Sequence, residues 1–204
     1  MTYAAGSGPF LEVVHRQRAC RRFKPDAVSD DLLEVLFDAA CQAPSAENRQ
    51  PWEFLVVRDP DAREAIGRLY RLAWTGGAKD ATSRRVGADL LVEVDAGAMG
   101  GIAGAPVLVV VCGDEERGHP TALASSVFPA VQNLLLTATA MGLGSALTTL
   151  AVLHRGPVAD LLGLPGHVRP MAIIPIGWPA RVLGPPVREP GRSRAHRERY
   201  GQPW

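Results

Sequence analysis

The stretch CQAPSAENRQPWEFLVV, residues 41–57, constrains the fold most strongly, because a helix must end there before an apolar strand begins. Pro44 cannot continue a helix, since it lacks a backbone N–H and its ring clashes with the preceding turn. Ser45 and Asn48 then offer hydroxyl and amide groups for hydrogen bonding. The stretch therefore predicts either an ordinary helix-to-strand connection or a loop that presents polar groups beside an apolar floor.

Hydrophobic periodicity predicts the other elements. Residues 29–41 form an amphipathic helix in this interpretation, with Ser29 at the N-cap and acidic residues in the first turn. The same periodicity predicts helices at about 9–18, 60–73, 121–140 and 155–162, and strands at 53–58, 106–112, 144–149 and 170–177. Residues 74–104 are rich in Gly and Ala and are expected to be irregular. Mixed elements with varied connections predict an α+β fold, a sheet covered by helices.

Composition limits the classes of function. With 204 residues, 47% of them apolar, the chain is long enough for one well-buried domain, 1–204. The balance of 22 basic against 21 acidic residues argues against a nucleic-acid-binding surface. The basic C-terminal extension is the exception, with Arg192, Arg194, Arg197 and Arg199. It is either a solvated, partner-facing segment or a contact to a phosphate backbone.

The cellular setting is predicted from what the sequence lacks. Three scattered cysteines form no disulfide framework, which favours a reducing compartment. The opening MTYAAGSGPF has no basic region before an apolar run, and no apolar stretch has the length of a membrane helix. Five histidines stand apart from one another, without the spacing of metal ligands. We expect a cytoplasmic protein with no membrane partner and no bound metal.

Several motifs together resemble the FMN-dependent nitroreductase family. Residues 18–25 read R-x-x-R-R-F-K-P, and the helix that follows leads into A-P-S-x-x-N-x-Q-P-W. The resemblance continues through APVLVVVC, GLGSALTTL, MAIIPIGWP and VREP, and only residues 74–104 are largely unmatched. It implies an α+β fold with a central, mostly antiparallel sheet flanked by helices. It also implies a homodimer with shared active sites.

The resemblance implies how FMN phosphate is bound. Gln17, Arg18 and Ala19 occupy positions where the family usually shows Arg-Arg-Ser, so one guanidinium and one hydroxyl are missing here. The neighbouring Arg16 could compensate. Arg188, in VREP, matches the family's second phosphate arginine, although it could instead be an exposed tail residue. Guanidinium groups suit a phosphate because they are always charged and donate two bonds at once.

The resemblance also implies how the flavin ring is held. Arg21 falls where the family places a basic group near flavin N1 and the C2 carbonyl, and a positive charge there stabilises the reduced ring. The alternative interpretation is that Arg21 is a charge on the surface, at the end of a helix. The backbone of Leu147, Thr148 and Thr149 would lie along the ring, with the Thr149 amide near N5, unless this is simply a buried strand. The contacts expected from the other subunit are Pro44, Ser45 and Asn48.

The implied activity is that of an FMN-dependent oxidoreductase. Hydride would pass from NADH or NADPH through flavin N5 to an electron-poor acceptor such as a nitroaromatic or a quinone, in a ping-pong cycle. GLGSAL has only two of the glycines of a dinucleotide-binding turn, so no separate nicotinamide fold is expected. Two alternatives stay open. One is a flavin-binding or flavin-sequestering protein without turnover, and the other is a divergent reaction such as dehalogenation, ring oxidation or flavin fragmentation.

The unmatched segment 74–104 could control access to the flavin. Glycines bracket the apolar run Leu90, Leu91 and Val92, as hinges would bracket a small moving piece. One hypothesis is that residues from about 84 to 95 form a short helical lid over the exposed face of the flavin, with Trp74 at its edge. The other is a solvated surface excursion.

Overall fold

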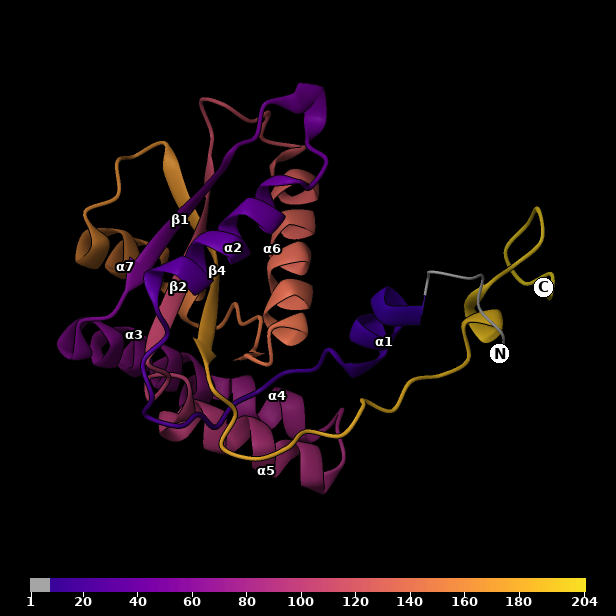
Figure 1. The fold of residues 1–204 in the computed structure, drawn as a ribbon, viewed down its shortest axis with the longest axis horizontal. Coiled ribbons are helices and arrows are strands. Elements are labelled where there is room, and N and C mark those ends of the chain that lie inside the picture. The colour runs from indigo at the N-terminus through magenta and orange to yellow at the C-terminus, as the bar shows by residue number, and fades with distance from the viewer. Residues whose placement is uncertain (1–7) are drawn as a thin grey trace.

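A four-stranded antiparallel sheet forms the centre of the computed structural model, which describes residues 8–204 (Figure 1). The strands are β1 (Trp52–Val57), β2 (Val107–Asp114), β3 (Gly144–Ser145) and β4 (Val168–Gly177), in the order β1-β2-β4-β3. All eight residues of β2 are buried, because both faces of the sheet are covered. The α+β architecture with an antiparallel sheet is confirmed.

Alternate residues of the central strand face two different helical layers. Val107, Val109 and Val111 pack against α2 (Asp30–Cys41) and α6 (Leu123–Ala140). Leu108 and Val110 face the opposite layer, which contains α3 (Pro60–Ala73) and the helical segment that follows it. This alternation is the period of two that a pleated strand imposes on its side chains. The shorter helices α1 (Gly8–Arg16) and α7 (Arg155–Leu162) lie beside α6 and β4, respectively.

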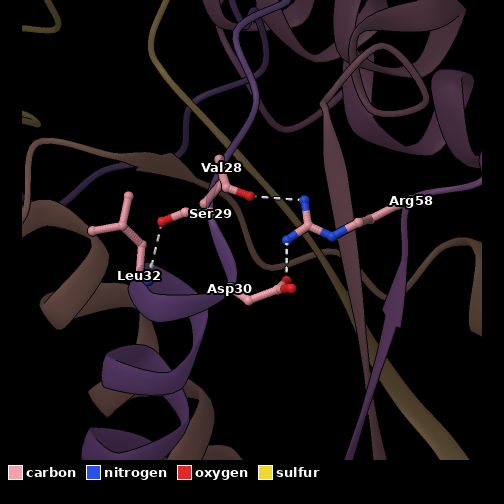
Figure 2. Close-up of polar contacts among 5 residues, drawn as sticks. All are labelled: Val28, Ser29, Asp30, Leu32 and Arg58. Atoms are coloured by element: carbon pink, nitrogen blue, oxygen red, sulfur yellow. Dashed lines mark hydrogen bonds and ion pairs between the residues drawn. The ribbon is translucent and has the colours of Figure 1, made fainter.

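The start of α2 is fixed by contacts that the sequence predicts in part (Figure 2). The Ser29 hydroxyl accepts a hydrogen bond from the Leu32 amide at 3.4 Å, which confirms the predicted N-cap. The Arg58 guanidinium, just after β1, donates to the Val28 carbonyl at 2.7 Å and pairs with Asp30 at 2.6 Å. The helix therefore begins against the end of β1, and Pro44 follows its last residues before the short helix η1 (Ala46–Asn48).

Helix α6 is the central helix of the larger core cluster. Eight of its residues are buried, and it ends two residues before Gly142, whose φ of 77° lies in the left-handed region that glycine tolerates. Among residues 8–204, it is the helix with the length and apolar composition that a membrane span requires. Its packing against α2 and the sheet accounts for that composition.

The prediction that residues 74–104 are irregular is wrong, because the segment is helical through most of its length. It comprises the π-turn η2 (Trp74–Ala78), α4 (Lys79–Ser83), α5 (Ala88–Ala96) and the π-turn η3 (Gly97–Gly101). Gly77 and Gly100 adopt φ values of 128° and 157°, which are not helical, so each glycine forms a kink between two successive helices. A short helix was expected at about 84–95, and α5 occupies most of that range.

Two other boundaries differ from the prediction. The predicted strand 144–149 is regular only over β3, after which Thr148 makes a single bridge to Ile173. The predicted helix 9–18 ends at Arg16, because the chain then becomes extended and Ala19 pairs with Ser145. The expectation about MTYAAGSGPF falls mainly on residues 1–7, which lie outside the described residues. Beyond Gly184, whose carbonyl still accepts from Arg18, the chain extends away from the body of the molecule as a long tail (Figure 1).

Candidate functional site

The arginine-rich segment after α1 lies along the edge of the sheet. Ala19 forms a parallel bridge with Ser145, and the Cys20 amide donates to the Ser145 carbonyl at 2.8 Å. Further along, the Lys24 amide donates to the Trp178 carbonyl at 2.8 Å. Residues 17–24 therefore extend the sheet beside β3. Two of the sequence motifs, more than a hundred residues apart in the chain, become neighbours in this way.

A cavity of about 330 Å³ opens next to this segment. Its polar lining is cationic and contains no carboxylate among the residues that the structure describes: Arg16, Arg18, Lys24 and Arg181. Gly142 and Gly144 bring backbone to its wall. Arg18 donates to the Gly184 carbonyl at 3.0 Å, and Arg16 lies 3.4 Å from Glu12, so both guanidinium groups keep further N–H donors for a ligand. Such a cluster suits a dianionic phosphate group.

Two of these cations were missed by the sequence interpretation. Lys24 entered only as part of the R-x-x-R-R-F-K-P motif, without a role in the site, and Arg181 lies two residues after the MAIIPIGWP motif. Both enter the cavity because residues 17–24 pair with the end of β4 and the residues after it. They add positive charge beside Gln17 and Ala19, the positions at which a guanidinium and a hydroxyl are missing.

Arg21 lies deeper than a surface charge would. Its side chain is half-buried, and burial lowers the pKa of its guanidinium, against the opposing effects of Tyr70 and Glu93. Glu93, on α5, also pairs with Arg181 at 2.9 Å. Arg21 and Arg18 share a narrow crevice with these two residues. The structure thus brings Arg18 and Arg21 together, close to the cationic cavity.

The segment after β3 lines a second cavity, also of about 330 Å³. Thr148 is buried and exchanges two hydrogen bonds with Ile173, at 3.1 and 2.9 Å. Because side chains alternate, Leu147 and Thr149 on either side are exposed. Thr149 lines the cavity together with apolar and basic side chains: Phe128, Val152, Leu153, Arg155, Arg169, Pro170 and Met171. The arrangement offers a cavity of mixed apolar and basic lining beside the exposed residue Thr149.

The loop with Pro44, Ser45 and Asn48 lies at the other end of α6. The Ser126 hydroxyl, in the first turn of α6, accepts from the Ala46 amide at 3.1 Å, whereas Thr139 in the last turn lines the cationic cavity. An 18-residue helix is about 27 Å long. Within one chain, the structure therefore does not bring this loop to Arg18.

The same loop has an unusual backbone. Glu47, Asn48 and Gln50 have φ values of 54°, 53° and 49°, in the left-handed region that glycine normally occupies. The Ser45 hydroxyl holds the loop by accepting from the Gln50 amide at 3.0 Å. Pro44 and Asn48 are exposed. The loop is thus a fixed, polar and accessible surface.

Arg188 lies on the exposed tail, where its guanidinium donates to the Val187 carbonyl at 3.1 Å. It does not line either cavity in the described residues. Within one chain, the structure does not bring Arg188 to the cavity that Arg18 lines, and its contact with phosphate stays a prediction.

Comparison with known proteins agrees with this architecture. A sequence model of the nitroreductase family matches residues 14–178. The chain belongs to the nitroreductase family. This nitroreductase-family oxidoreductase is 31% identical to an NADH dehydrogenase of Thermus thermophilus over 192 residues, which cover 86% of this chain and 89% of that protein. It is also 25% identical to mouse iodotyrosine deiodinase 1, over 86% of this chain and 64% of the mouse protein.

A solved structure shows the same fold. A nitroreductase-type protein of Desulfovibrio desulfuricans, in complex with FMN, superposes with a TM-score of 0.74 at 26% identity, covering 94% of this chain and 98% of that one. The family and fold predicted from the motifs are confirmed.

Proposed function

We propose that this family member is an FMN-dependent oxidoreductase that takes electrons from NADH or NADPH and delivers them to an electron-poor acceptor such as a nitroaromatic or a quinone. The observation that carries the proposal is the cationic cavity beside residues 17–24. Among the described residues, its lining contributes three guanidinium groups and one ammonium group and no carboxylate, while Glu12 and Glu93 pair with Arg16 and Arg181 from outside the lining. Such a lining has the chemistry that a phosphate requires. The related structure in complex with FMN supports the choice of this flavin.

The residues of the chain have separate tasks in this proposal. Arg18, with Arg16, Lys24 and Arg181, holds the phosphate. Arg21 supplies positive charge near the pyrimidine side of the ring, where negative charge develops on reduction. FMN, when bound, supplies a ring that accepts hydride at N5 and releases the electrons again. The segment Leu147 to Thr149 supports the ring, and the cavity beside Thr149, which is lined by apolar and basic side chains, admits flat partners.

The proposed assembly is a homodimer in which each site uses both subunits. Ser45 and Asn48 lie at the opposite end of α6 from Arg18, on a loop held by hydrogen bonds, which supports a role for them in a site on another chain. The exposed tail that carries Arg188 is suited to the same purpose. A twofold dimer would then contain two equivalent sites.

The decisive experiment is the absorption spectrum of the purified protein, followed by anaerobic titration with NADH and with NADPH. A yellow protein that bleaches with either nicotinamide and recovers its colour on addition of a quinone supports the proposal. A yellow protein that does not bleach favours the flavin-sequestering alternative. A protein that cannot bind added FMN contradicts both.

Arg18→Ala is expected to weaken FMN binding about tenfold or more, since a charged hydrogen bond contributes about 1.5–3 kcal/mol. Arg68→Ala is the matched control, because Arg68 is an exposed arginine on α3 and lines neither cavity. Fluorescence titration of the apoprotein with FMN measures both affinities. Equal affinity in the two variants would remove Arg18 from the phosphate site.

A second candidate function is reductive dehalogenation, which the similarity to iodotyrosine deiodinase 1 favours. The apolar cavity beside Thr149 also contains Arg155 and Arg169, which suit an aromatic substrate with a carboxylate. Release of iodide from iodotyrosine by the reduced protein would establish this reaction. Turnover of quinones without release of iodide would exclude it.

A further inference from the structure

Arg21 lies in a groove formed by two glycines of the π-turn η3. A Cβ atom added to Gly97 would lie 2.8 Å from the Arg21 Cδ, and one added to Gly101 would lie 2.1 Å from the Arg21 carbonyl oxygen. Both distances are shorter than real Cβ contacts allow. Gly97 therefore makes room for the side chain of Arg21, whereas Gly101 makes room for its backbone.

The same face of this helical segment carries a negative charge. Glu93 lies four residues before Gly97 on α5, so the two residues share one face of the helix. Glu93 pairs with Arg181 at 2.9 Å and lines the same narrow crevice as Arg21. A carboxylate followed by two closely packed glycines therefore faces Arg21.

The groove is anchored to the core of the protein. Trp74, Ala98 and Ile102 are each no more than 2% exposed, and they pack with Ile66 and Tyr70 of α3. The Trp74 indole N–H also donates to the Asp95 carboxylate at 3.0 Å. Both ends of the segment are thus fixed, and Trp74 belongs to the core. Only its outer side is open, at Leu90, Val92 and Met99.

We propose that the segment α5–η3 is a positioning element for Arg21, in which Gly97 and Gly101 set the place of its side chain and backbone. The consequence for the flavin rests on the proposed function, because it assumes that the charge of Arg21 acts on FMN. Residues 74–104, which the family motifs leave unmatched, then have a role in the site itself. This role does not require the segment to open and close.

The packing is tested on the apoprotein by thermal unfolding. Gly97→Ala is expected to lower the unfolding midpoint in the native background and to have a smaller effect in an Arg21→Ala background, where the colliding Cδ is gone and only the Arg21 Cβ remains, at 3.3 Å. Gly101→Ala is expected to lower the midpoint in both backgrounds, because the Arg21 carbonyl oxygen remains. The control is Gly76→Ala, since Gly76 has no atom near its added Cβ. Equal effects of Gly97→Ala in the two backgrounds would overturn the proposal.

The effect on the flavin is tested through the midpoint reduction potential of bound FMN. Arg21→Ala is expected to lower the potential. Gly97→Ala is expected to lower it by a smaller amount and to cause no further change in the Arg21→Ala background. A potential for Gly97→Ala equal to that of Gly76→Ala would overturn the positioning role.

These measurements separate the two proposals. If Arg21→Ala leaves the potential unchanged while the unfolding pattern holds, then the groove stands and the electrostatic role of Arg21 in the proposed function is wrong. If Arg21→Ala lowers the potential but Gly97→Ala does not, then the positioning inference alone is wrong. If the protein binds no FMN, then both the proposed function and the effect of Arg21 on the reduction potential are wrong. The unfolding midpoints still test whether Gly97 and Gly101 pack against Arg21.

Discussion

At the scale of single residues, burial controls the chemistry of the three cysteines. Cys112, in the central strand, is fully buried, and burial followed by the nearby charge of Glu53 raises the pKa of its thiol to about 12. Burial also raises the pKa of the Cys20 thiol, and the thiol donates a hydrogen bond to the Arg22 carbonyl at 3.3 Å. Cys41 is exposed at the end of α2. The three thiols therefore differ in access and, for the two buried ones, in acidity.

Iodoacetamide applied to the native protein at about pH 8 is expected to modify Cys41 and to spare Cys20 and Cys112, because only the thiolate is nucleophilic. Peptide mass spectrometry identifies the modified residue. Cys41→Ser should abolish labelling of the folded protein, and labelling of all three cysteines in urea provides the control. Rapid modification of Cys20 in the native protein would show that the arginine-rich segment is less well packed than described.

The sequence predicts local structure correctly where it depends on a single side chain and its near neighbours in the chain. Ser29 caps α2 and Pro44 lies beyond its end, because hydroxyl capping and the missing proline N–H act within a few residues. Lys24 and Arg181 could not be placed in the cavity from the sequence. Their position depends on the pairing of residues 17–24 with a strand that lies far away in the chain.

At the scale of elements, the segment 74–104 shows why glycine was misinterpreted. Glycines usually indicate turns, since they relax the backbone. Here Gly77 and Gly100 have positive φ inside π-turns, and the helical path continues on both sides of each. The helices are held by tertiary packing of Trp74 and Ile102, which periodicity over short, interrupted runs does not reveal. Whether α5 also covers the flavin stays a prediction.

The contacts of Asp95 with Lys79 and Trp74, which join α5 to the beginning of this segment, are expected to depend on pH. Hydrogen bonds from Lys79 and then from Trp74 lower the pKa of Asp95. A carboxyl whose pKa is lower in the folded state than in the unfolded chain stabilises the folded protein at any pH above its unfolded-state pKa, which is about 3.9. This contribution is lost as the pH falls through the pKa of the folded state. Asp95→Asn should therefore lower the thermal midpoint near neutral pH, and the difference from the native protein should shrink below about pH 4.

The control for this measurement is Asp80→Asn, since Asp80 is an exposed carboxylate on α4 within the same segment. Its midpoint should follow that of the native protein at each pH. A deficit of Asp95→Asn that stayed constant from neutral to acidic pH would mean that charge at Asp95 is not the cause.

At the scale of the whole molecule, the described chain holds the parts of the proposed site in three separate places. Arg18 and Arg21 lie beside β3, the loop of Ser45 lies at the far end of α6, and Arg188 lies on the tail. The order of elements and the sheet could be predicted because apolar periodicity is a local property. The assembly of the site could not, because in the proposed homodimer its parts come from two copies of the chain. The tail is correspondingly exposed, with Val182 at 99% and Val187 at 96%.

A mixture of two inactive variants tests the shared site. Arg18→Ala and Asn48→Ala should each bind FMN poorly when refolded alone. When they are refolded together, about half of the dimers should be mixed, and each mixed dimer would contain one intact site of its two. About one site in four should therefore be restored. Sedimentation of the dilute holoprotein should show a dimer. FMN titration of the mixture, compared with each variant refolded alone, measures the recovery. A monomer that retains its flavin, or a mixture without recovery, would contradict the shared site.

The left-handed loop has a consequence for how this protein can be changed. Glu47 and Gln50 occupy a backbone region that costs about 1 kcal/mol or more for residues other than glycine. Selection for thermal stability alone would therefore favour glycine at these positions, since glycine adopts the same backbone without that cost. A thermostabilised lineage would gain resistance to heat while its loop lost the side chains that it now presents. At these two positions, heat stability and the side chains of the loop would therefore be in competition.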